Sequence, residues 1–246
     1  MAPLLEGNNL SKSFGGLKAI HRLDFYLREG EILGLIGPNG SGKTTLFNLV
    51  AGVFKPDSGK IWFEDRDITR VGSASICQMG IGRTFQITRP FPRLTVLDNV
   101  KLGRAYGGQP AKTLERAQVE SEEILEMIGL SIKRSVMAGT IGLMDRKRLE
   151  LGKALATRPK VLLLDEIMGG LNPTEIQAAM NLIRQIRDSG ISLIVVEHVM
   201  KAILGLSERV IVLNAGRKIA EGSPKEVVLD NQVIEAYLGV DQDEEE

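Results

Sequence analysis

Apolar residues along this chain gather in short runs that alternate with longer amphipathic stretches. Three runs, Glu31–Ile36, Val161–Leu164 and Ile191–Val196, are rich in Val, Ile and Leu and are bounded by polar or glycine residues. Runs of this length predict strands that are buried on both faces of a parallel sheet. The stretch Asn172–Gly190, between the last two runs, has apolar residues at helical spacing. Because strands and helices alternate, the pattern predicts an α/β core.

The stretch Asn172–Gly190 also carries the signals of helix ends. Asn172 can cap the first turn, Pro173 fits the first helical position, and Glu175 stands three residues after the cap. Gly190 favours a stop. The face that we expect to pack on the sheet consists of Ile176, Ala179, Met180, Ile183 and Ile186.

The first sixty residues follow a different pattern. Short alternating segments lie at Asn8–Phe14, Ala19–Leu27 and Lys60–Glu64, with turn residues between them. Alternation of this kind predicts strands with one buried face. We therefore expect a small antiparallel sheet at the edge of the core.

Residues 87–150 are polar and lack the apolar runs that are typical of strands. The segment Pro110–Met127 predicts one long amphipathic helix. We expect the core in 1–86 and 151–240, with the small β subdomain at its N-terminal end, an inserted helical subdomain in 87–150 and an acidic tail in 241–246. The apolar positions of the long helix and the residue after it are Leu114, Ala117, Ile124, Leu125 and Ile128.

Composition restricts the class of protein further. The 31 Lys and Arg residues balance the 31 Asp and Glu residues, so the basic surplus typical of a nucleic-acid-binding protein is missing. The single cysteine, Cys77, excludes an internal disulfide and fits a reducing compartment. No apolar run approaches the roughly 18 residues that a membrane span needs, and the N-terminus does not resemble a signal peptide. We expect a cytoplasmic protein without a nucleic-acid partner.

A glycine-rich loop follows the first apolar run. Its sequence matches G-x-x-x-x-G-K-[ST] and lies between a predicted strand and a predicted helix, Thr45–Ala51. Glycines allow successive N–H groups to point at phosphate oxygens, the lysine binds the β- and γ-phosphates, and the hydroxyl is a ligand for Mg²⁺. The loop predicts a nucleotide site formed by Gly37, Pro38, Asn39, Gly40, Ser41, Gly42, Lys43, Thr44 and Thr45.

Two carboxylates follow the second apolar run. Asp165 and Glu166 end a buried strand, and such a strand delivers its last side chains to the sheet edge where phosphates bind. Asp165 can hold Mg²⁺, and Glu166 can polarise a water for attack on the γ-phosphate. A small-molecule kinase needs only the loop and acceptor contacts. The guanine-reading motif Asn-Lys-x-Asp is missing from the chain, so ATP hydrolysis is favoured.

Two further polar residues stand at positions that suit this chemistry. His198 follows the third apolar run and could donate a hydrogen bond to the γ-phosphate or to the attacking water, although a lone histidine there is often structural. Gln86 lies where the core joins the helical subdomain, and its amide could ligate Mg²⁺ or position a water. The motifs thus place catalysis on Lys43, Glu166 and His198.

Taken in order, these motifs resemble the ATP-binding subunits of ABC transporters over about Leu4–Gly239. The phosphate loop is followed by Gln86 of the Q-loop, VLLLDE of Walker B, GGLNP of the D-loop and the switch residue His198. The resemblance implies an α/β fold with a RecA-like P-loop core, a small antiparallel β subdomain and an inserted helical subdomain. It also implies ATP and Mg²⁺ as cofactors, with Mg²⁺ held by Thr44, Gln86 and Asp165, and it assigns adenine stacking to Phe14.

Three stretches narrow the resemblance to the LivG-type ATPase of branched-chain amino-acid importers. They are GRTFQITRPFPRLTVLDNV, the pair Glu197-His198 and IAEGSPKEVVLDNQVIEAYLG. This resemblance implies a second ATPase subunit of LivF type, or a second copy of the chain. It further implies two permease subunits, contacted near Arg89–Leu94, an extracytoplasmic solute-binding protein that acts indirectly, and a peripheral position on the inner face of the cell membrane. The ATPase of a lipid or polysaccharide exporter, a non-transport ABC ATPase and a regulatory module without turnover stay open as alternatives.

One segment departs from this family. The signature Leu-Ser-x-Gly-Gln corresponds to Ile141–Asp145, where Gly142 replaces the serine, Met144 the glycine and Asp145 the glutamine. In the family this loop faces the nucleotide of the partner subunit. We therefore expect an asymmetric heterodimer in which the site with Glu166 is competent and the site completed for the partner is weakened. The alternative is that backbone amides preserve the function of this loop.

Two neighbouring stretches carry smaller expectations. The basic run Arg146–Arg148 predicts a solvated helix face. Ile167 and Met168 replace the proline and small residue that commonly follow the glutamate in this family, next to the D-loop at 169–173. We expect this change to alter packing without moving the carboxylate of Glu166.

Overall fold

The computed structural model describes residues 2–238 and contains a central six-stranded sheet of order β10-β9-β3-β8-β7-β6. Five of its strands are parallel, and β10 pairs antiparallel with β9. The three apolar runs form β3, β7 and β8, as predicted, whereas β6, β9 and β10 had no prediction. The strands are β3 (Ile32–Ile36), β6 (Ile81–Arg83), β7 (Val161–Asp165), β8 (Ser192–Val196), β9 (Arg209–Asn214) and β10 (Arg217–Gly222).

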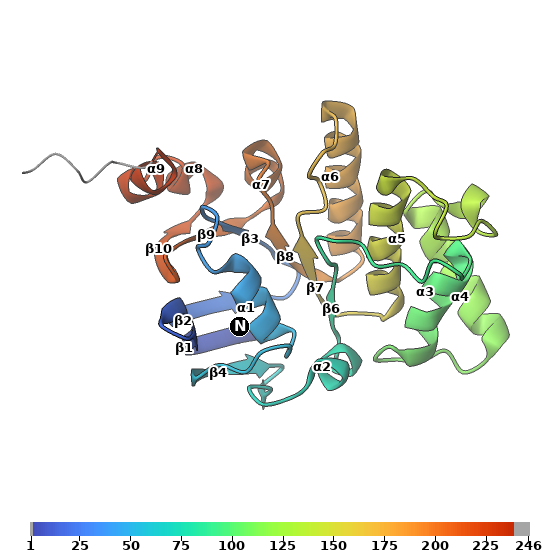
Figure 1. Ribbon diagram of the computed structural model, residues 1–246, viewed down its shortest axis with the longest axis horizontal. Helices are drawn as coiled ribbons and strands as arrows, with labels where there is room; N and C mark the ends of the chain where they lie inside the picture. The colour runs from blue at the N-terminus through green and yellow to red at the C-terminus, as the bar shows by residue number, and fades with distance from the viewer. Residues whose placement is uncertain (1, 239–246) are drawn as a thin grey trace, which may run out of the picture.

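A second, antiparallel sheet of order β2-β1-β4-β5 lies beside the core (Figure 1). It confirms the prediction for the first sixty residues, although β1, β2 and β4 each begin two or three residues earlier than predicted. Apolar side chains of β1, β2 and β4 pack with helix α1 and one face of the central sheet. The strands are β1 (Leu5–Phe14), β2 (Leu17–Leu27), β4 (Ser58–Phe63) and β5 (Arg66–Asp67).

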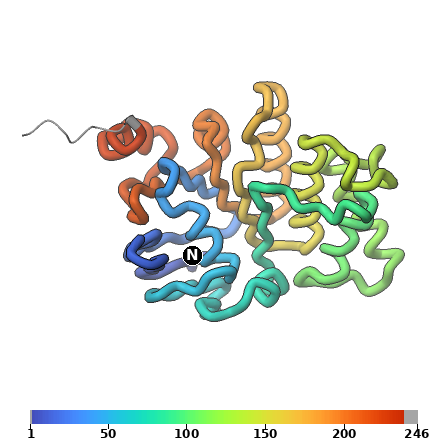
Figure 2. The backbone as a smooth tube through the Cα atoms, in the orientation of Figure 1, coloured from blue at the N-terminus to red at the C-terminus, as the bar shows by residue number. Residues whose placement is uncertain are grey.

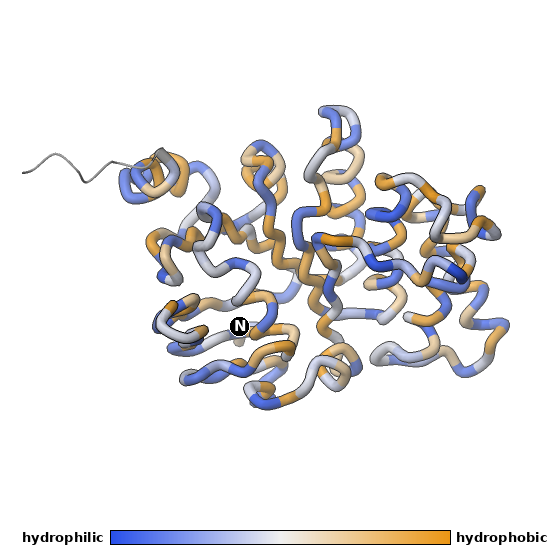
Figure 3. The backbone as a smooth tube through the Cα atoms, viewed as in Figure 1, coloured by the Kyte–Doolittle hydropathy of each residue, from blue (hydrophilic) through white to orange (hydrophobic). Residues whose placement is uncertain are grey.

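Helices cover both faces of the central sheet because successive strand residues point to opposite sides. Leu33 and Leu35 of β3 belong to the cluster that includes α1, whereas Ile32 and Ile36 belong to the cluster that includes α6 and α7. The central strands form the most hydrophobic part of the trace (Figure 3). The helices of this core are α1 (Lys43–Val50), α2 (Ser73–Met79), α6 (Pro173–Asp188), α7 (Met200–Leu206), α8 (Pro224–Val227) and α9 (Asn231–Leu238).

Helix α6 confirms its sequence signals. Asn172 Oδ1 accepts from the Glu175 N–H, and the Glu175 carboxylate accepts from the Asn172 N–H, which completes a capping box. Met180, Ile183 and Ile186 of its predicted face are buried against the sheet. Helix α1 begins at Lys43, two residues before the predicted start, because the glycine-rich loop turns directly into the helix.

Helices α3 (Val96–Tyr106), α4 (Leu114–Met127) and α5 (Leu143–Ala156), with a short 3₁₀ turn at Ser131–Lys133, form a lobe beside the core (Figures 1 and 2). The predicted long helix was wrong at its start: Thr113 accepts from the Arg116 N–H and caps α4, so Pro110 lies outside it. Leu114, one of the apolar positions named for this helix, is 76% exposed. Helix α5 continues past position 150, the expected limit of the lobe.

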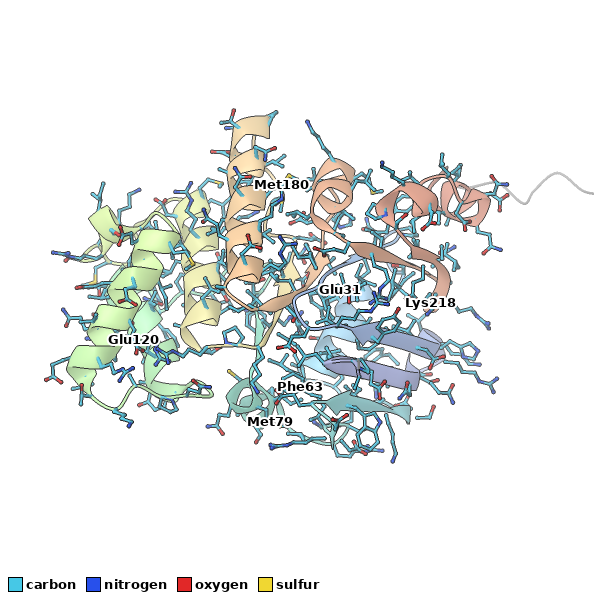
Figure 4. All side chains as sticks on the ribbon, turned by 180° about the vertical axis from the view of Figure 1, so that it is seen from behind. Glu31, Phe63, Met79, Glu120, Met180 and Lys218 are labelled. Atoms are coloured by element: carbon cyan, nitrogen blue, oxygen red, sulfur yellow. The ribbon has the colours of Figure 1, made fainter. Side chains whose placement is uncertain are left out.

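A partly buried ion-pair cluster holds α4 against its neighbours. Glu120, seen on α4 in Figure 4, lies 2.5 Å from Arg104 Nη2, 2.8 Å from Arg116 Nε and 2.7 Å from Arg158 Nη2. Arg104 comes from α3, and Arg158 follows α5, so one carboxylate joins three parts of the lobe. The predicted acidic tail at 241–246 lies outside the described residues. Among residues 2–238, no helix combines the length and apolarity that crossing a bilayer would require.

Candidate functional site

The predicted motifs meet at one edge of the central sheet. Strands β3, β7 and β8 are parallel, so their C-terminal ends lie on the same side. The glycine-rich loop follows β3, Glu166 follows β7, and Glu197 and His198 follow β8 (Figure 1). The fold thus brings together residues separated by more than 150 positions.

The glycine-rich loop has a backbone that only glycine can follow. Gly37, Gly40 and Gly42 have φ values of 149°, 78° and 106°. A Cβ on Gly37 would lie 2.1 Å from Leu213 O, and one on Gly42 would lie 2.4 Å from Ala19 O. Gly42 is also the N-cap of α1 and offers no side-chain acceptor, so the first N–H groups of the helix are free for a ligand.

Lys43 lies inside this loop and is buried. Its Nζ donates to Gly37 O at 2.7 Å and to Pro38 O at 3.0 Å. Burial lowers the pKa of Lys43, and the nearby carboxylates of Glu166 and Asp165 oppose that effect. The ammonium group is therefore held at the loop and close to both acidic residues. Ser41 Oγ is buried and has no partner among the described residues, whereas Thr44 is exposed on the first turn of α1.

Asp165 is buried at the end of β7 and pairs with an arginine that the motifs did not identify. Arg83 Nη2 lies 3.0 Å from Asp165 Oδ2, and Arg83 Nη1 donates to Asn48 Oδ1 at 2.5 Å. Burial raises the pKa of Asp165, and Arg83 opposes the rise. The guanidinium lies over the rings of Phe47 and Phe85, at 5.7 and 5.3 Å from their centroids. A lone arginine in the apolar segment GIGRTF was the available sequence signal.

Glu166 receives two polar side chains from different elements. Gln86 Nε2 donates to Glu166 Oε2 at 2.5 Å, and His198 Nε2 lies 2.7 Å from Glu166 Oε1. The Glu166 N–H donates to Val196 O at 2.9 Å. The φ of Glu166 is 51°, in the left-handed region, which is costly for residues other than glycine. The structure therefore brings Gln86, Glu166 and His198 into direct contact.

A third acidic residue at this edge, Glu197, was noted in the sequence only as the neighbour of His198. Glu197 is 3% exposed, and its Oε1 accepts from the Met168 N–H at 2.7 Å. Burial raises the pKa of Glu197 to about 7, opposed by the Met168 N–H and by Lys147. A short apolar strand ending in glutamate could have drawn attention to it, but only the fold shows its burial.

Phe14 lies at the end of β1, in the hairpin that leads into β2. Its ring is 44% exposed and meets Phe54 edge-to-face at a centroid distance of 5.2 Å, with Lys12 Nζ 5.6 Å from its centroid. Strand β2 also carries Ala19, whose carbonyl lies against Gly42. The hairpin therefore presents an exposed aromatic surface and packs against the glycine-rich loop.

The oxygen donors at this edge fit a magnesium ion bound together with a nucleotide. No group of three or more His, Cys, Asp or Glu side chains in residues 2–238 could hold a metal. Mg²⁺ commonly takes one or two protein ligands and fills its other positions with phosphate oxygens and waters. The hydroxyl of Thr44, the carboxylate of Asp165 and the amide oxygen of Gln86 are hard ligands of the required kind.

The segment Ile141–Asp145 lies at the start of α5. Gly142 is the N-cap and provides no side-chain acceptor, while Leu143 is 66% exposed. The carboxylate of Asp145 pairs with Lys133, so its charge is not isolated. Met144 lines a cleft of about 380 Å³ between α5, α6 and the end of α4.

The basic run that follows is not simply a solvated face, contrary to expectation. Arg146 donates to Ile141 O at 3.0 Å and to Gly139 O at 2.9 Å, and Lys147 donates to Gly169 O. These bonds hold the loop before α5 and connect α5 to the D-loop. The side chains therefore satisfy backbone carbonyls that would otherwise lack partners.

A glycine-rich phosphate loop, an acidic strand end and a histidine on a parallel α/β core define a nucleotide-binding ATPase cassette. Residues 20–169 match the family described as ABC transporter, and residues 217–243 match the family described as branched-chain amino acid ATP-binding cassette transporter. The chain belongs to the ABC transporter family, as its motifs predicted.

Individual relatives agree with this placement. The chain is 38% identical to the high-affinity branched-chain amino acid transport ATP-binding protein LivG of Salmonella typhimurium, over 96% of this chain and 98% of that protein. It is 34% identical to the lipopolysaccharide export system ATP-binding protein LptB of Acidithiobacillus ferridurans, over 97% and 98%. The ADP conformation of the ATP-binding cassette MJ1267 superposes with a TM-score of 0.87 at 32% identity, covering 98% of this chain and all of that one.

Proposed function

We propose that this chain is the ATP-hydrolysing subunit of an importer for branched-chain or related amino acids. The observation that carries the proposal is the contact of Gln86 and His198 with Glu166 beside the phosphate loop. The similarity to LivG and the match of residues 217–243 support the amino-acid cargo. ATP is the nucleotide expected from the family.

Each residue at the sheet edge has a distinct task in this proposal. The loop amides and Lys43 bind the β- and γ-phosphates, and Phe14 stacks on the adenine. Glu166 orients the attacking water and draws on its proton as the water oxygen approaches the γ-phosphorus. His198 holds Glu166 through Oε1 and stands beside the terminal phosphate. Mg²⁺, when bound with ATP, neutralises phosphate charge, and Thr44, Asp165 and Gln86 would hold it.

The assembly that we propose pairs this chain with a LivF-like ATPase, or with a second copy of itself, on two permease subunits. An extracytoplasmic binding protein delivers the solute, and the chain lies on the inner face of the membrane. We further propose that the two nucleotide sites are unequal because Gly142 lacks the serine hydroxyl and Met144 restricts approach to the backbone. Asp145 pairs with Lys133, so repulsion between its carboxylate and the partner's phosphates is a weak reason for this asymmetry. The proposal therefore rests on the replacements at Gly142 and Met144.

Substitution of the glutamate in one subunit at a time tests both proposals. In the reconstituted complex, Glu166→Gln in this chain should lower turnover by about 10²- to 10⁴-fold and leave ATP affinity nearly unchanged. The equivalent substitution in the partner should cost much less. Glu123→Gln, on the exposed face of α4, is the matched control and should leave turnover unchanged. Full turnover of Glu166→Gln would contradict the catalytic role, and equal losses from both subunits would contradict the asymmetry.

The similarity to LptB gives a second candidate cargo, a lipopolysaccharide. The two alternatives differ in what stimulates ATP hydrolysis by the reconstituted complex. An importer should respond to leucine, isoleucine or valine together with its binding protein. Stimulation by lipopolysaccharide, without a response to these amino acids, would favour the exporter.

A further inference from the structure

A buried carboxylate lies behind the group formed by Gln86, Glu166 and His198, and the roles proposed above do not use it. Glu197 is the residue before His198, and its Oε1 accepts from the backbone N–H of Met168 at 2.7 Å. Met168 is fully buried and lies two residues after Glu166. Glu197 therefore spans the gap between the segment after β7 and the segment after β8.

Three hydrogen bonds connect these two segments. The Glu166 N–H donates to Val196 O at 2.9 Å, the Met168 N–H donates to the Glu197 carboxylate, and His198 Nε2 contacts Glu166 Oε1 at 2.7 Å. The first involves only backbone atoms, and the third lies at the reacting end of the group. The second depends on a buried side chain, so a substitution at Glu197 can remove it and leave the side chains of Glu166 and His198 unchanged.

The surroundings of Glu197 supply little else to hold it. Its Oε2 is buried without a partner in the described part of the chain, and no lysine or arginine forms an ion pair with it there. Two charged groups act on Glu197: Lys147 of α5 attracts its negative charge, and Glu166, which follows β7, repels it. The backbone N–H of His198 also favours the ionised form of Glu197. A buried carboxylate with one unsatisfied oxygen is costly. A residue kept at this cost is expected to hold neighbouring residues in position.

We propose that Glu197 is a positioning residue, which sets the distance between His198 and Glu166 by anchoring the Met168 N–H. Loss of the anchor frees the segment after Glu166 to move relative to the segment that carries His198. The carboxylate of Glu166 and the ring of His198 are then no longer held at a fixed distance from each other. The inference rests on the catalytic roles proposed for Glu166 and His198, and it adds the residue that holds them together.

Kinetics of three variants in the reconstituted complex test the proposal. Glu197→Ala removes the acceptor and should lower kcat by about tenfold or more, with KM for ATP changed less than about twofold, because misplacement of reacting groups affects the chemical step. Glu197→Gln keeps an acceptor for the Met168 N–H and should retain kcat within about threefold at pH 7, since only the charge changes. Its kcat should also depend less on pH between about 6 and 8 than that of the parent.

Glu31→Gln is the matched control. Glu31, labelled in Figure 4, is also a buried glutamate. It precedes β3, at the opposite end of the parallel strands from Glu197, and it pairs with Arg209. It should lower thermal stability and leave kcat unchanged. If Glu197→Ala retained the kcat of the parent, or if Glu197→Gln lost as much as Glu197→Ala at every pH, the positioning role would be overturned.

Histidine NMR on the isolated full chain gives a readout that does not depend on turnover. The chain has two histidines, and His21 on β2 serves as an internal reference. Glu197→Ala should shift the ring signals of His198 and leave those of His21 in place, and Glu31→Gln should move neither. Unmoved His198 signals in Glu197→Ala would also overturn the proposal. If the signals moved while Glu166→Gln retained full turnover, the proposed catalytic function would fail and the anchor itself would stand.

Discussion

Two helices of this protein begin in similar ways and end up suited to different tasks. Helix α1 and helix α5 both have a glycine N-cap, Gly42 and Gly142, and neither receives a hydrogen bond from a capping side chain. At α1 the next residue is Lys43, which is buried and faces the loop. At α5 the first turn contains Asp145, which pairs with Lys133.

The comparison shows how side chains decide what a helix N-terminus can bind. Unsatisfied N–H groups favour an anion at both helices. At α1 the curled loop and Lys43 add donors and positive charge in one direction, so phosphate binding is favoured. At α5 Asp145 in the first turn pairs with Lys133, and Gly142 and Met144 stand where the family has a serine and a glycine. The same backbone geometry therefore lies next to a buried cation at α1 and next to a paired carboxylate at α5.

The largest expected effect comes from removing the cation at α1. Lys43→Ala should lower nucleotide affinity by about 100-fold or more, because a buried ammonium that faces phosphate oxygens is lost. Isothermal titration with ATP and Mg²⁺ measures the change. Lys160→Ala, which removes a surface lysine paired with Glu64, is the control and should bind as the parent does. Undiminished affinity in Lys43→Ala would contradict phosphate binding at the N-terminus of α1.

A pH effect on stability of comparable size is expected at the same sheet edge. Burial raises the pKa of Glu197 from its ordinary value of 4.5 to about 7, so the folded state binds the proton more tightly than the unfolded state. The free energy of unfolding should therefore fall as pH rises from about 5 to about 7.5. Glu197→Gln lacks this titration and should be more stable than the parent by about 3 kcal/mol at pH 8, with the difference vanishing near pH 4.

Thermal or urea unfolding at several pH values measures this difference. Glu150→Gln provides a comparison in the lobe, because Glu150 is buried but paired with Lys153. If the advantage of Glu197→Gln did not change with pH, the raised pKa would be contradicted.

The smallest effect, a change in turnover, is expected from substitutions at the N-terminus of α5. Gly142→Ser together with Met144→Gly should raise turnover of the reconstituted complex by up to about twofold, because restoring a hydroxyl donor and close backbone approach lets the second site work beside the one that contains Glu166. A Cβ at position 142 would meet no atom within 4 Å, so serine fits there. The same pair of changes should make the glutamate of the partner more important for turnover.

A matched control exists at another glycine N-cap. Gly72 starts α2, also without a side-chain cap, and a Cβ there would meet no atom within 4 Å. Gly72→Ser should alter helix capping to a similar extent and leave turnover unchanged. If the changes at 142 and 144 left turnover the same, the sites would be equal and the asymmetry would be wrong.

Much of the fold followed from local patterns. The apolar runs identified β3, β7 and β8 because strands buried on both faces need continuous apolar sequence. The capping box of α6 was readable because its residues are neighbours in sequence. In contrast, β6, β9 and β10 were not predicted, although β9 is a buried member of the sheet. The start of α4 was misplaced because Thr113, rather than Pro110, provides the cap.

The sequence by itself determined the glycine-rich loop, the acidic strand end and the family, because these depend on residue types at fixed local spacing. Only the tertiary structure decided which side chains meet. It joined Arg83 to Asp165, Glu197 to Met168 and Lys133 to Asp145. The physical reason is that burial and pairing depend on which distant strands and helices lie side by side, and these conditions determine how a carboxylate is charged and what it can hold.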